Sequence, residues 1–286
     1  MLKKALLWKE WVSTRATMFG LLGLLLAVYP VSLHLVPSSG MRVQIAATPL
    51  AASIGFVLAI MALAGERKHS TIDFLLSLPF SRREIFTNKI AYHLTSLVMI
   101  MVVNYGALLA VWNFNLSVRE MLDISYIHNL FFVFTVAAIF TFAFTLIFTT
   151  IAGSIVAAGV FTGIFFIFPL GFLGLLALTL WPYSQGIRQY SDELVLWGSR
   201  FSPFEIIDPT IIQGNWPWIL AASAVLVLGA SLLFLRNPVE KNGHVVVFTA
   251  LEPVLKVGVA ICSALLVGAF MAINPILHVL FAILGS

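Results

Sequence analysis

Long apolar runs separated by short polar segments make up most of this chain of 286 residues. A run of about 20 residues forms a helix that crosses a hydrocarbon core of about 30 Å. The pattern therefore predicts seven membrane spans and an all-α polytopic membrane protein. We expect the spans near residues 17–36, 46–64, 90–112, 129–150, 155–180, 218–235 and 257–284.

The composition agrees with a membrane protein. Hydrophobic residues make up 60% of the chain and charged residues only 10%, whereas soluble domains carry about 25% charged residues. The single cysteine, Cys262, excludes an internal disulfide. The first apolar run is longer than the roughly 7–15 apolar residues of a signal peptide, so we expect an uncleaved first span.

The placement of Lys and Arg predicts the orientation in a cell (plasma) membrane, because cytosolic loops carry an excess of both. With the N-terminus in the cytosol, twelve of the 16 basic residues fall in cytosolic segments. Residues 66–89 are then cytosolic and residues 181–217 are external. The four basic residues on the external side are Arg42, Arg119, Arg188 and Arg200.

Three shorter segments carry their own predictions. Residues 1–15, with two tryptophans and four basic groups, suit a helix in the headgroup region or an ordered cytosolic tail. Residues 152–154 are small and predict a tight turn between the fourth and fifth spans. In the external segment, Ser202 precedes a proline and then a glutamate, which predicts a short surface helix near residues 203–212.

The segment 66–89 is the longest charge-bearing run between two spans and predicts two short helices. Ser70 is placed to cap the first helix, with an acidic residue three positions on, and Pro79 ends it. Ser81 is followed three residues later by Glu84, which is the pattern of a capping box. Two capped helices with much apolar surface indicate a docking element for a soluble partner at the membrane surface.

Motifs for chemistry within this chain are absent from the sequence. It contains no G-x-x-x-x-G-K-[ST], H-E-x-x-H or G-x-S-x-G motif, and its six histidines lack metal-ligand spacing. We therefore expect no catalytic residue and no metal site. No charged residue falls in the middle of a predicted span, so an ion-driven carrier lacks an obvious coupling group. Polar residues within spans, such as His93, Asn104, Thr135 and Thr149, are expected to form hydrogen bonds between helices.

The pattern ER-x-x-x-T-x-x-x-LLSLP-x-SRREI-x-x-x-K in residues 66–89 resembles the first cytosolic loop of ABC-2 type ABC transporter permeases. The order of elements in residues 1–236 is also similar to that family. The resemblance implies a six-helix transmembrane core there. It leaves residues 237–286 as a cytosolic connector and at least one extra C-terminal span. The tail beginning RNPVEKNGHVVVF resembles a Gram-positive subgroup of the Ytr type, associated with cell-envelope stress.

The family resemblance implies a transporter that exports or extrudes an amphipathic substrate, such as a peptide antibiotic or a lipid-like molecule. In the family, separate cytosolic ATPase subunits bind ATP and Mg²⁺ and dock on the first loop, and two membrane subunits form a homodimer or heterodimer. This chain would then be no enzyme, would need no cofactor of its own, would contact membrane lipid and would have no nucleic-acid partner. The residues carried over as ATPase contacts are Glu66, Arg67, Asp73, Phe74, Ser81, Arg82, Arg83 and Glu84.

Two further interpretations stay open at this stage. Gly159, Gly163 and Pro169 on the fifth span are candidates for the dimer contact and the pathway wall, but ordinary helix packing within one subunit also explains them. Arg82 and Arg83 would pair with acidic groups of a partner or with anionic lipid headgroups. The alternative function is an ATP-independent secondary carrier or a structural membrane partner in an envelope-stress sensing complex.

Overall fold

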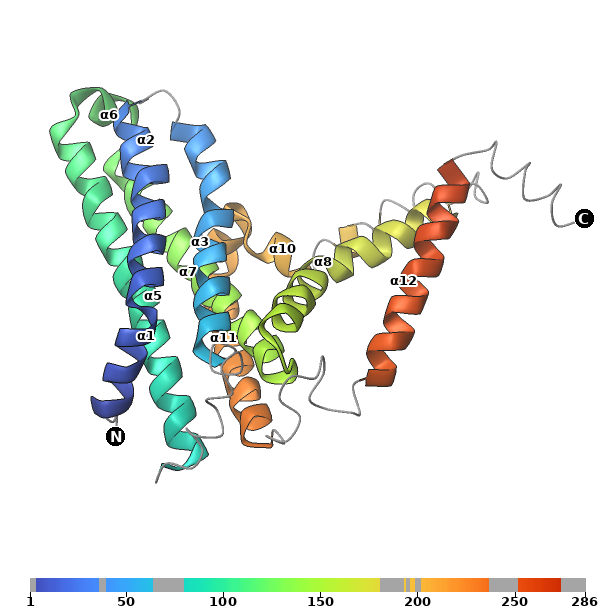
Figure 1. Cartoon of the computed structure of the whole chain (residues 1–286). Coiled ribbons are helices and arrows are strands. Elements are labelled where there is room, and N and C mark those ends of the chain that lie inside the picture. Colours follow the sequence, from blue (N-terminus) through green and yellow to red (C-terminus); the bar gives the residue numbers. More distant parts are fainter. Residues whose placement is uncertain are drawn as a thin grey trace, which may run out of the picture. The chain divides into compact units, whose positions relative to one another are not determined.

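The computed structural model describes residues 4–35, 40–63, 80–180, 193, 196–198, 202–236 and 252–273, and its elements are helices (Figure 1). The first span region is one helix with a π-helical turn: α1 (Lys4–Leu26), η1 (Ala27–Val31) and α2 (Ser32–Leu35). The other helices are α3 (Gly40–Leu63), α5 (Arg82–Phe114), α6 (Leu116–Met121), α7 (Ile124–Ile151), α8 (Ile155–Leu180), α10 (Pro203–Ile206), α11 (Pro209–Arg236) and α12 (Glu252–Ile273).

In the part of the chain that the structure describes, five helices are long and apolar enough to cross a membrane, which confirms the prediction of a polytopic membrane protein. They are the α1–η1–α2 helix, α5, α7, α8 and α11. Within α3 and α12 the apolar stretches found are the shorter segments Thr48–Leu63 and Lys256–Gly268. The second and the seventh predicted spans therefore stay predictions.

Two predicted boundaries inside the first half of the chain differ from the structure. Residues 4–15 do not form an element apart from the first span but are the first turns of α1, because the sequence there contains no glycine or proline. The second short helix of the predicted loop is likewise the start of α5, which continues without a break from Arg82 to Phe114. The first short helix of that loop lies outside the described residues.

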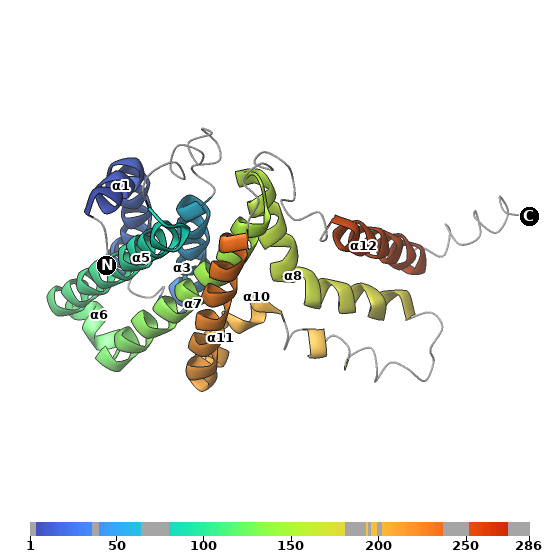
Figure 2. The ribbon, with the colours of Figure 1, turned by 90° about the horizontal axis from the view of Figure 1, so that it is seen from below.

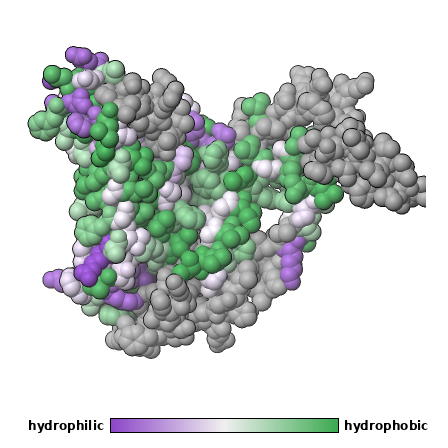
Figure 3. Space-filling model, turned by 45° about the horizontal axis from the view of Figure 1, so that its top comes forward, coloured by the Kyte–Doolittle hydropathy of each residue, from purple (hydrophilic) through white to green (hydrophobic). Residues whose placement is uncertain are grey.

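The chain divides into two units, of which the first contains residues 1–162 and 207–247. In this unit α1 and α5 lie side by side, and α3 and α11 both pack on α7 (Figures 1 and 2). Close approach of α3 and α7 requires Gly55, because a Cβ there would collide with the carbonyl oxygen of Ala138. On the face in Figure 3, apolar side chains of this unit form a broad band with hydrophilic residues at both ends.

The connection between α5 and α7 is mostly a short helix, α6, whose two ends are fixed by side-chain contacts. Asn115 accepts hydrogen bonds from the backbone N–H groups of Ser117 and Val118 and so caps the six-residue helix α6. The Trp112 indole donates to the Leu122 carbonyl (2.9 Å), and the Arg119 guanidinium lies 5.1 Å from the Trp112 ring centroid. The predicted tight turn at residues 152–154 is confirmed, since α7 ends at Ile151 and α8 begins at Ile155.

Two of the threonines in the spans do not form the predicted hydrogen bonds between helices. Thr135 and Thr149 donate to carbonyls of their own helix, at Phe131 and Leu146. This is the common alternative for a threonine in a helix, because its hydroxyl reaches the carbonyl three or four residues back. The Asn104 side-chain oxygen is buried and accepts no hydrogen bond from the described residues.

The second unit contains residues 163–206 and 248–286. Its described contacts are between the later part of α8, α10 and α12: Thr179 donates to the Leu265 carbonyl (3.3 Å), and Ser202 donates to the Phe166 carbonyl (3.1 Å). The surface helix predicted near residues 203–212 is instead two helices. Only Pro203–Ile206 is α10, and α11 begins at Pro209.

The break before α11 has a clear local cause. The Asp208 carboxylate accepts a hydrogen bond from the Thr210 backbone N–H (2.8 Å), and Pro209 occupies the first helical position. An acidic cap followed by proline is a strong helix start. The carboxylate accepts a hydrogen bond from a backbone N–H that has no intrahelical partner, and proline has no such N–H to satisfy. Residues 209–217 are therefore the first turns of α11, which continues without a break into the predicted sixth span.

Candidate functional site

The start of α5 carries the capping box that the sequence predicts. The Ser81 backbone N–H donates to the Glu84 carboxylate (3.0 Å), and the Glu84 backbone N–H donates to the Ser81 hydroxyl oxygen (3.2 Å). Both donors would otherwise lack an intrahelical partner. A reciprocal pair of this kind fixes where α5 begins, so the first turn is a defined helical end and not a frayed one.

The first two turns of α5 divide sharply into an exposed and a buried part. Ser81, Arg82 and Arg83 are exposed. Ile85 is 1% exposed and Phe86 is 4% exposed, so the apolar side of the same turns packs inside the protein. The Phe86 ring centroid lies 5.2 Å from that of Phe234 at the end of α11. The first turn of α5 is thus charged and exposed, whereas the base of α5, one turn further on, packs against α11 through Phe86.

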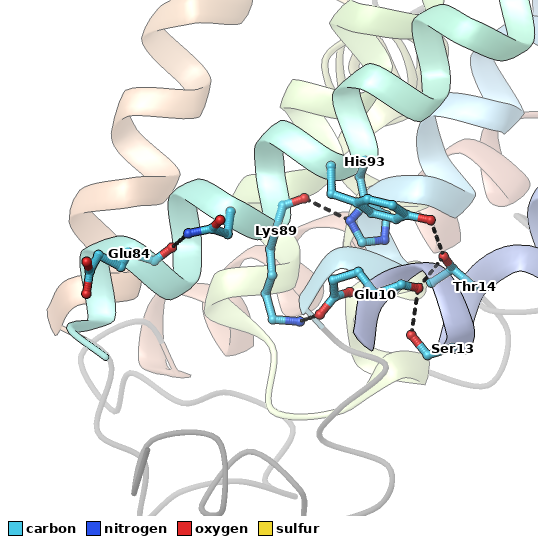
Figure 4. Close-up of polar contacts among 8 residues, drawn as sticks. Glu10, Ser13, Thr14, Glu84, Lys89 and His93 are labelled. Atoms are coloured by element: carbon cyan, nitrogen blue, oxygen red, sulfur yellow. Dashed lines mark hydrogen bonds and ion pairs between the residues drawn. The ribbon is translucent and has the colours of Figure 1, made fainter. Parts of the chain in front are cut away.

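On the other side, a buried ion pair connects the base of α5 to α1. The Lys89 ammonium lies 2.8 Å from the Glu10 carboxylate, and each side chain is only 5% exposed. Figure 4 shows Lys89 extending along α5 toward Glu10 on α1. Burial of a charge is costly unless an opposite charge and hydrogen bonds compensate it, so each of these two residues requires the other.

Hydroxyl groups extend the contact between α1 and α5 by one further turn. The Thr14 and Tyr92 hydroxyls are 3.0 Å apart, and Thr14 also donates to the Glu10 carbonyl (2.7 Å). Ser13 donates to the same carbonyl (3.0 Å), and His93 Nδ1 lies 2.9 Å from the Lys89 carbonyl of its own helix (Figure 4). His93 Nδ1 therefore does not form the predicted hydrogen bond to a neighbouring helix. We call Glu10, Thr14, Lys89 and Tyr92 the α1/α5 bridge.

The arrangement is suited to transmitting force between helices. No group of three or more His, Cys, Asp or Glu side chains able to hold a metal occurs in the described part of the chain. The α1/α5 bridge and the Phe86–Phe234 contact instead hold the base of α5 on two sides. A push on the exposed Ser81–Glu84 turn would move α5, α1 and α11 together, because packed helices shift as rigid elements.

The structure describes half of the residues that the sequence singles out for docking. Ser81, Arg82, Arg83 and Glu84 form the first turn of α5 and its cap. The remaining four docking residues, Glu66, Arg67, Asp73 and Phe74, lie outside the described residues.

The residues predicted for the dimer contact and pathway differ in their surroundings. A Cβ on Gly159 would contact Phe56 and Ile60 of α3 at 3.7 and 3.8 Å, which favours packing within one subunit for this residue. A Cβ on Gly163 would meet nothing within 4 Å. Pro169 lies inside α8, whose helix is continuous through it.

Sequence reasoning missed the role of Glu10. Its partner Lys89 is 79 positions away, so no local pattern joins them. One signal was available: Glu10 is the only acidic residue before the second predicted span. A lone carboxylate among basic groups near an apolar run is a candidate for pairing.

Comparison with known proteins adds the family. A family model described as "ABC-2 family transporter protein" matches residues 6–239, which contain nearly all of α1 to α11. No curated protein matches the chain.

Proposed function

The chain belongs to the ABC-2 family of transporter proteins and is a membrane component of such a transporter, and on this premise we propose that it exports an amphipathic substrate with energy from a separate cytosolic ATPase. Membrane components of this family are typically non-catalytic and generally pair with ATPase subunits. ATP and Mg²⁺ are then bound by the partner alone. The first turn of α5 and the preceding residues 66–80 form the docking element.

The observation that carries this proposal is the construction of α5. Arg82 and Arg83 are exposed at its capped start, where two guanidinium groups can pair with acidic side chains of a partner. The same helix continues for 33 residues as a membrane span. Its base is held to α1 by a buried ion pair and to α11 by the Phe86–Phe234 contact. Movement of a docked ATPase would therefore reach the membrane helices directly.

Several finer features are part of the same proposal. Two membrane subunits, identical or different, form the pathway, and Gly163 and Pro169 are candidates for its wall. Residues 1–236 are the transmembrane core, with 181–217 as the external insertion and the N-terminus in the cytosol. Residues 237–286 add a connector and a C-terminal span. The tail pattern after Arg236 supports the Ytr-type subgroup, and a peptide antibiotic or lipid-like substrate follows from that resemblance.

The docking element is tested by capture of the ATPase. The permease is expressed in its native host and purified in mild detergent, and any ATPase subunit that co-purifies is measured. The variants are Arg83→Glu at the start of α5 and Asp73→Arg in the preceding segment. Arg119→Glu is the matched control, because it is the same charge reversal in α6, which follows the other end of α5.

We expect Arg83→Glu and Asp73→Arg to reduce the captured ATPase strongly while Arg119→Glu leaves it at the wild-type level. Reversal of a charge that pairs across an interface typically costs about 2–5 kcal/mol, or a factor of about 30 or more in affinity. Wild-type capture by both docking variants contradicts the docking proposal. Absence of any associated ATPase instead favours an ATP-independent carrier or a structural membrane partner.

A further inference from the structure

α1 and α5 do not close against each other along their whole length. Two adjoining hollows lie on their shared surface, one of about 370 Å³ between the two helices and a shallow, open one at the start of α1. Trp11 and Tyr92 line both hollows, so the two form one continuous groove, which we call the α1/α5 groove. The wider end is lined by Lys4 and Trp8, and the narrower end reaches Val103.

The α1/α5 bridge fixes the spacing of the two helices beside the groove. Tyr92, which lines the groove, is bonded through its hydroxyl to Thr14 and lies 3.4 Å from the Met18 sulfur. One turn earlier, Lys89 is paired with Glu10. These polar contacts hold α1 and α5 at a fixed distance from each other, and this distance determines the width of the groove.

The length and lining of the groove fit one lipid chain. From Lys4 to Leu22 is 18 residues, or about 27 Å of helix at about 1.5 Å per residue. One leaflet of hydrocarbon is about 15 Å thick, so this length accommodates an acyl chain and part of a headgroup. The side chains beyond Trp11 are apolar or neutral, and Phe19, Met99 and Val103 are 62%, 60% and 44% exposed.

Charge at the wide end indicates which lipid binds. Among the described residues that line the groove, Lys4 is the charged one, and it lies beside Trp8 and Trp11. Tryptophan and lysine are characteristic of the headgroup level of a membrane. Glu10, the nearby carboxylate, is neutralised by Lys89 and does not line the groove. An ammonium with no acidic neighbour in the lining favours an anionic headgroup.

We propose that the α1/α5 groove binds one anionic phospholipid of the bilayer, with its phosphate at Lys4 and an acyl chain along Phe19, Met99 and Val103. The bound lipid fills the space that the bridge keeps open between the two helices. It would stabilise their contact near the base of α5. This inference rests on α1 and α5 alone and does not depend on the docking of an ATPase.

Native mass spectrometry of the purified full chain tests the proposal by counting retained lipids. The probes are phosphatidylglycerol and phosphatidylcholine with identical acyl chains. Met99→Trp fills the groove, and Leu228→Trp is its control, because Leu228 is 65% exposed on α11, away from the groove. Lys4→Glu reverses the charge at the wide end, and Arg15→Glu is the matched reversal on α1 outside the lining.

We expect wild type and both controls to retain one phosphatidylglycerol in preference to phosphatidylcholine. Met99→Trp should lose the retained lipid with either headgroup. Lys4→Glu should lower the preference for phosphatidylglycerol by at least about fivefold, since each basic group near an anionic surface contributes about that factor.

Three results would overturn the proposal. Retention by Met99→Trp equal to that of Leu228→Trp would place the lipid elsewhere. A headgroup preference unchanged in Lys4→Glu would remove the role of the ammonium. A change in the ratio of dimer to monomer in Met99→Trp, seen in the same spectra, would make a second copy of the chain the occupant. Val103→Trp fills the other end of the groove and keeps the test decisive if Met99→Trp does not fold.

Discussion

Removal of one partner of the Lys89–Glu10 ion pair should destabilise the protein strongly. The two charged atoms are 2.8 Å apart and both side chains are 5% exposed. At an effective dielectric constant of about 20, their attraction is about 6 kcal/mol before the cost of desolvation. Loss of one partner removes the opposite charge 2.8 Å away from a buried group, and breaking a buried pair in this way typically costs about 3–5 kcal/mol. We therefore expect Glu10→Gln and Lys89→Met each to lower the free energy of unfolding by about 3 kcal/mol or more.

The double variant separates the ion pair from other effects of the two substitutions. Glu10→Gln with Lys89→Met leaves no buried charge, so we expect it to be less destabilised than the sum of the single variants by about 2 kcal/mol or more. Unfolding is followed by circular dichroism in mixed detergent micelles. Arg15→Met is the control, because Arg15 is an exposed basic residue on the same helix and such changes stay within about 0.5 kcal/mol.

The result that would refute this reasoning is specific. If both single variants lie within about 0.5 kcal/mol of wild type, the pair behaves as a surface salt bridge. If the double variant equals the sum of the single ones, the two residues are stabilised by other neighbours and α1 is not held to α5 by their charges.

Three further predictions follow from the helix ends and the packing. Ser81→Ala should lower the free energy of unfolding by about 1 kcal/mol through loss of the cap, as measured by unfolding in the same micelles. Ser81→Asp should keep most of the stabilisation by the cap, because Asp is also a good N-cap residue. Gly55→Ala should destabilise by about 1–3 kcal/mol because its Cβ meets the Ala138 backbone. Gly106→Ala, with nothing within 4 Å, should be neutral or stabilising by up to about 1 kcal/mol; equal effects at both glycines would contradict the packing. The hydrogen bond from Ser125 lowers the pKa of Asp123. The stabilisation by the ionised Asp123 carboxylate is therefore present above the usual pKa of 3.8 and is lost as pH falls through the lowered pKa. Asp123→Asn should reduce this acid-induced loss of stability in a pH series of thermal unfolding.

Much of the fold follows from local sequence. The lengths of the apolar runs predict that α5, α7, α8 and α11 exist, because each must cover the same hydrocarbon thickness. The predicted bounds match those of α8, whereas α5 and α11 begin at Arg82 and Pro209, well before the predicted spans at 90 and 218. The capping box at Ser81 and the turn at residues 152–154 are also local patterns and were predicted correctly. The helix start at Asp208–Pro209 is also a local pattern. It falls inside the predicted surface segment instead, because the aromatic residues that follow it are typical of a membrane interface.

What the sequence could not provide are contacts between distant positions. Glu10 and Lys89 meet only because α1 and α5 pack side by side, so the lone carboxylate in residues 1–45 does not by itself identify its partner. The same holds for Gly55, whose requirement arises from the Ala138 backbone on α7. Thr135 and Thr149 show the reverse error: a polar residue in a span suggested a distant partner, but its own helix supplied one.

The central claim is that the start of α5 is a cytosolic docking surface, and thiol labelling tests it most directly. Cys262, the single cysteine, is replaced in Cys262→Ser, and Arg83→Cys or Arg119→Cys is added in that background. The account predicts that a membrane-impermeant maleimide labels Arg119→Cys in intact cells. It also predicts that Arg83→Cys is labelled only after the membrane is opened, and that the ATPase subunit then protects it. Labelling of Arg83→Cys from outside intact cells would contradict the account.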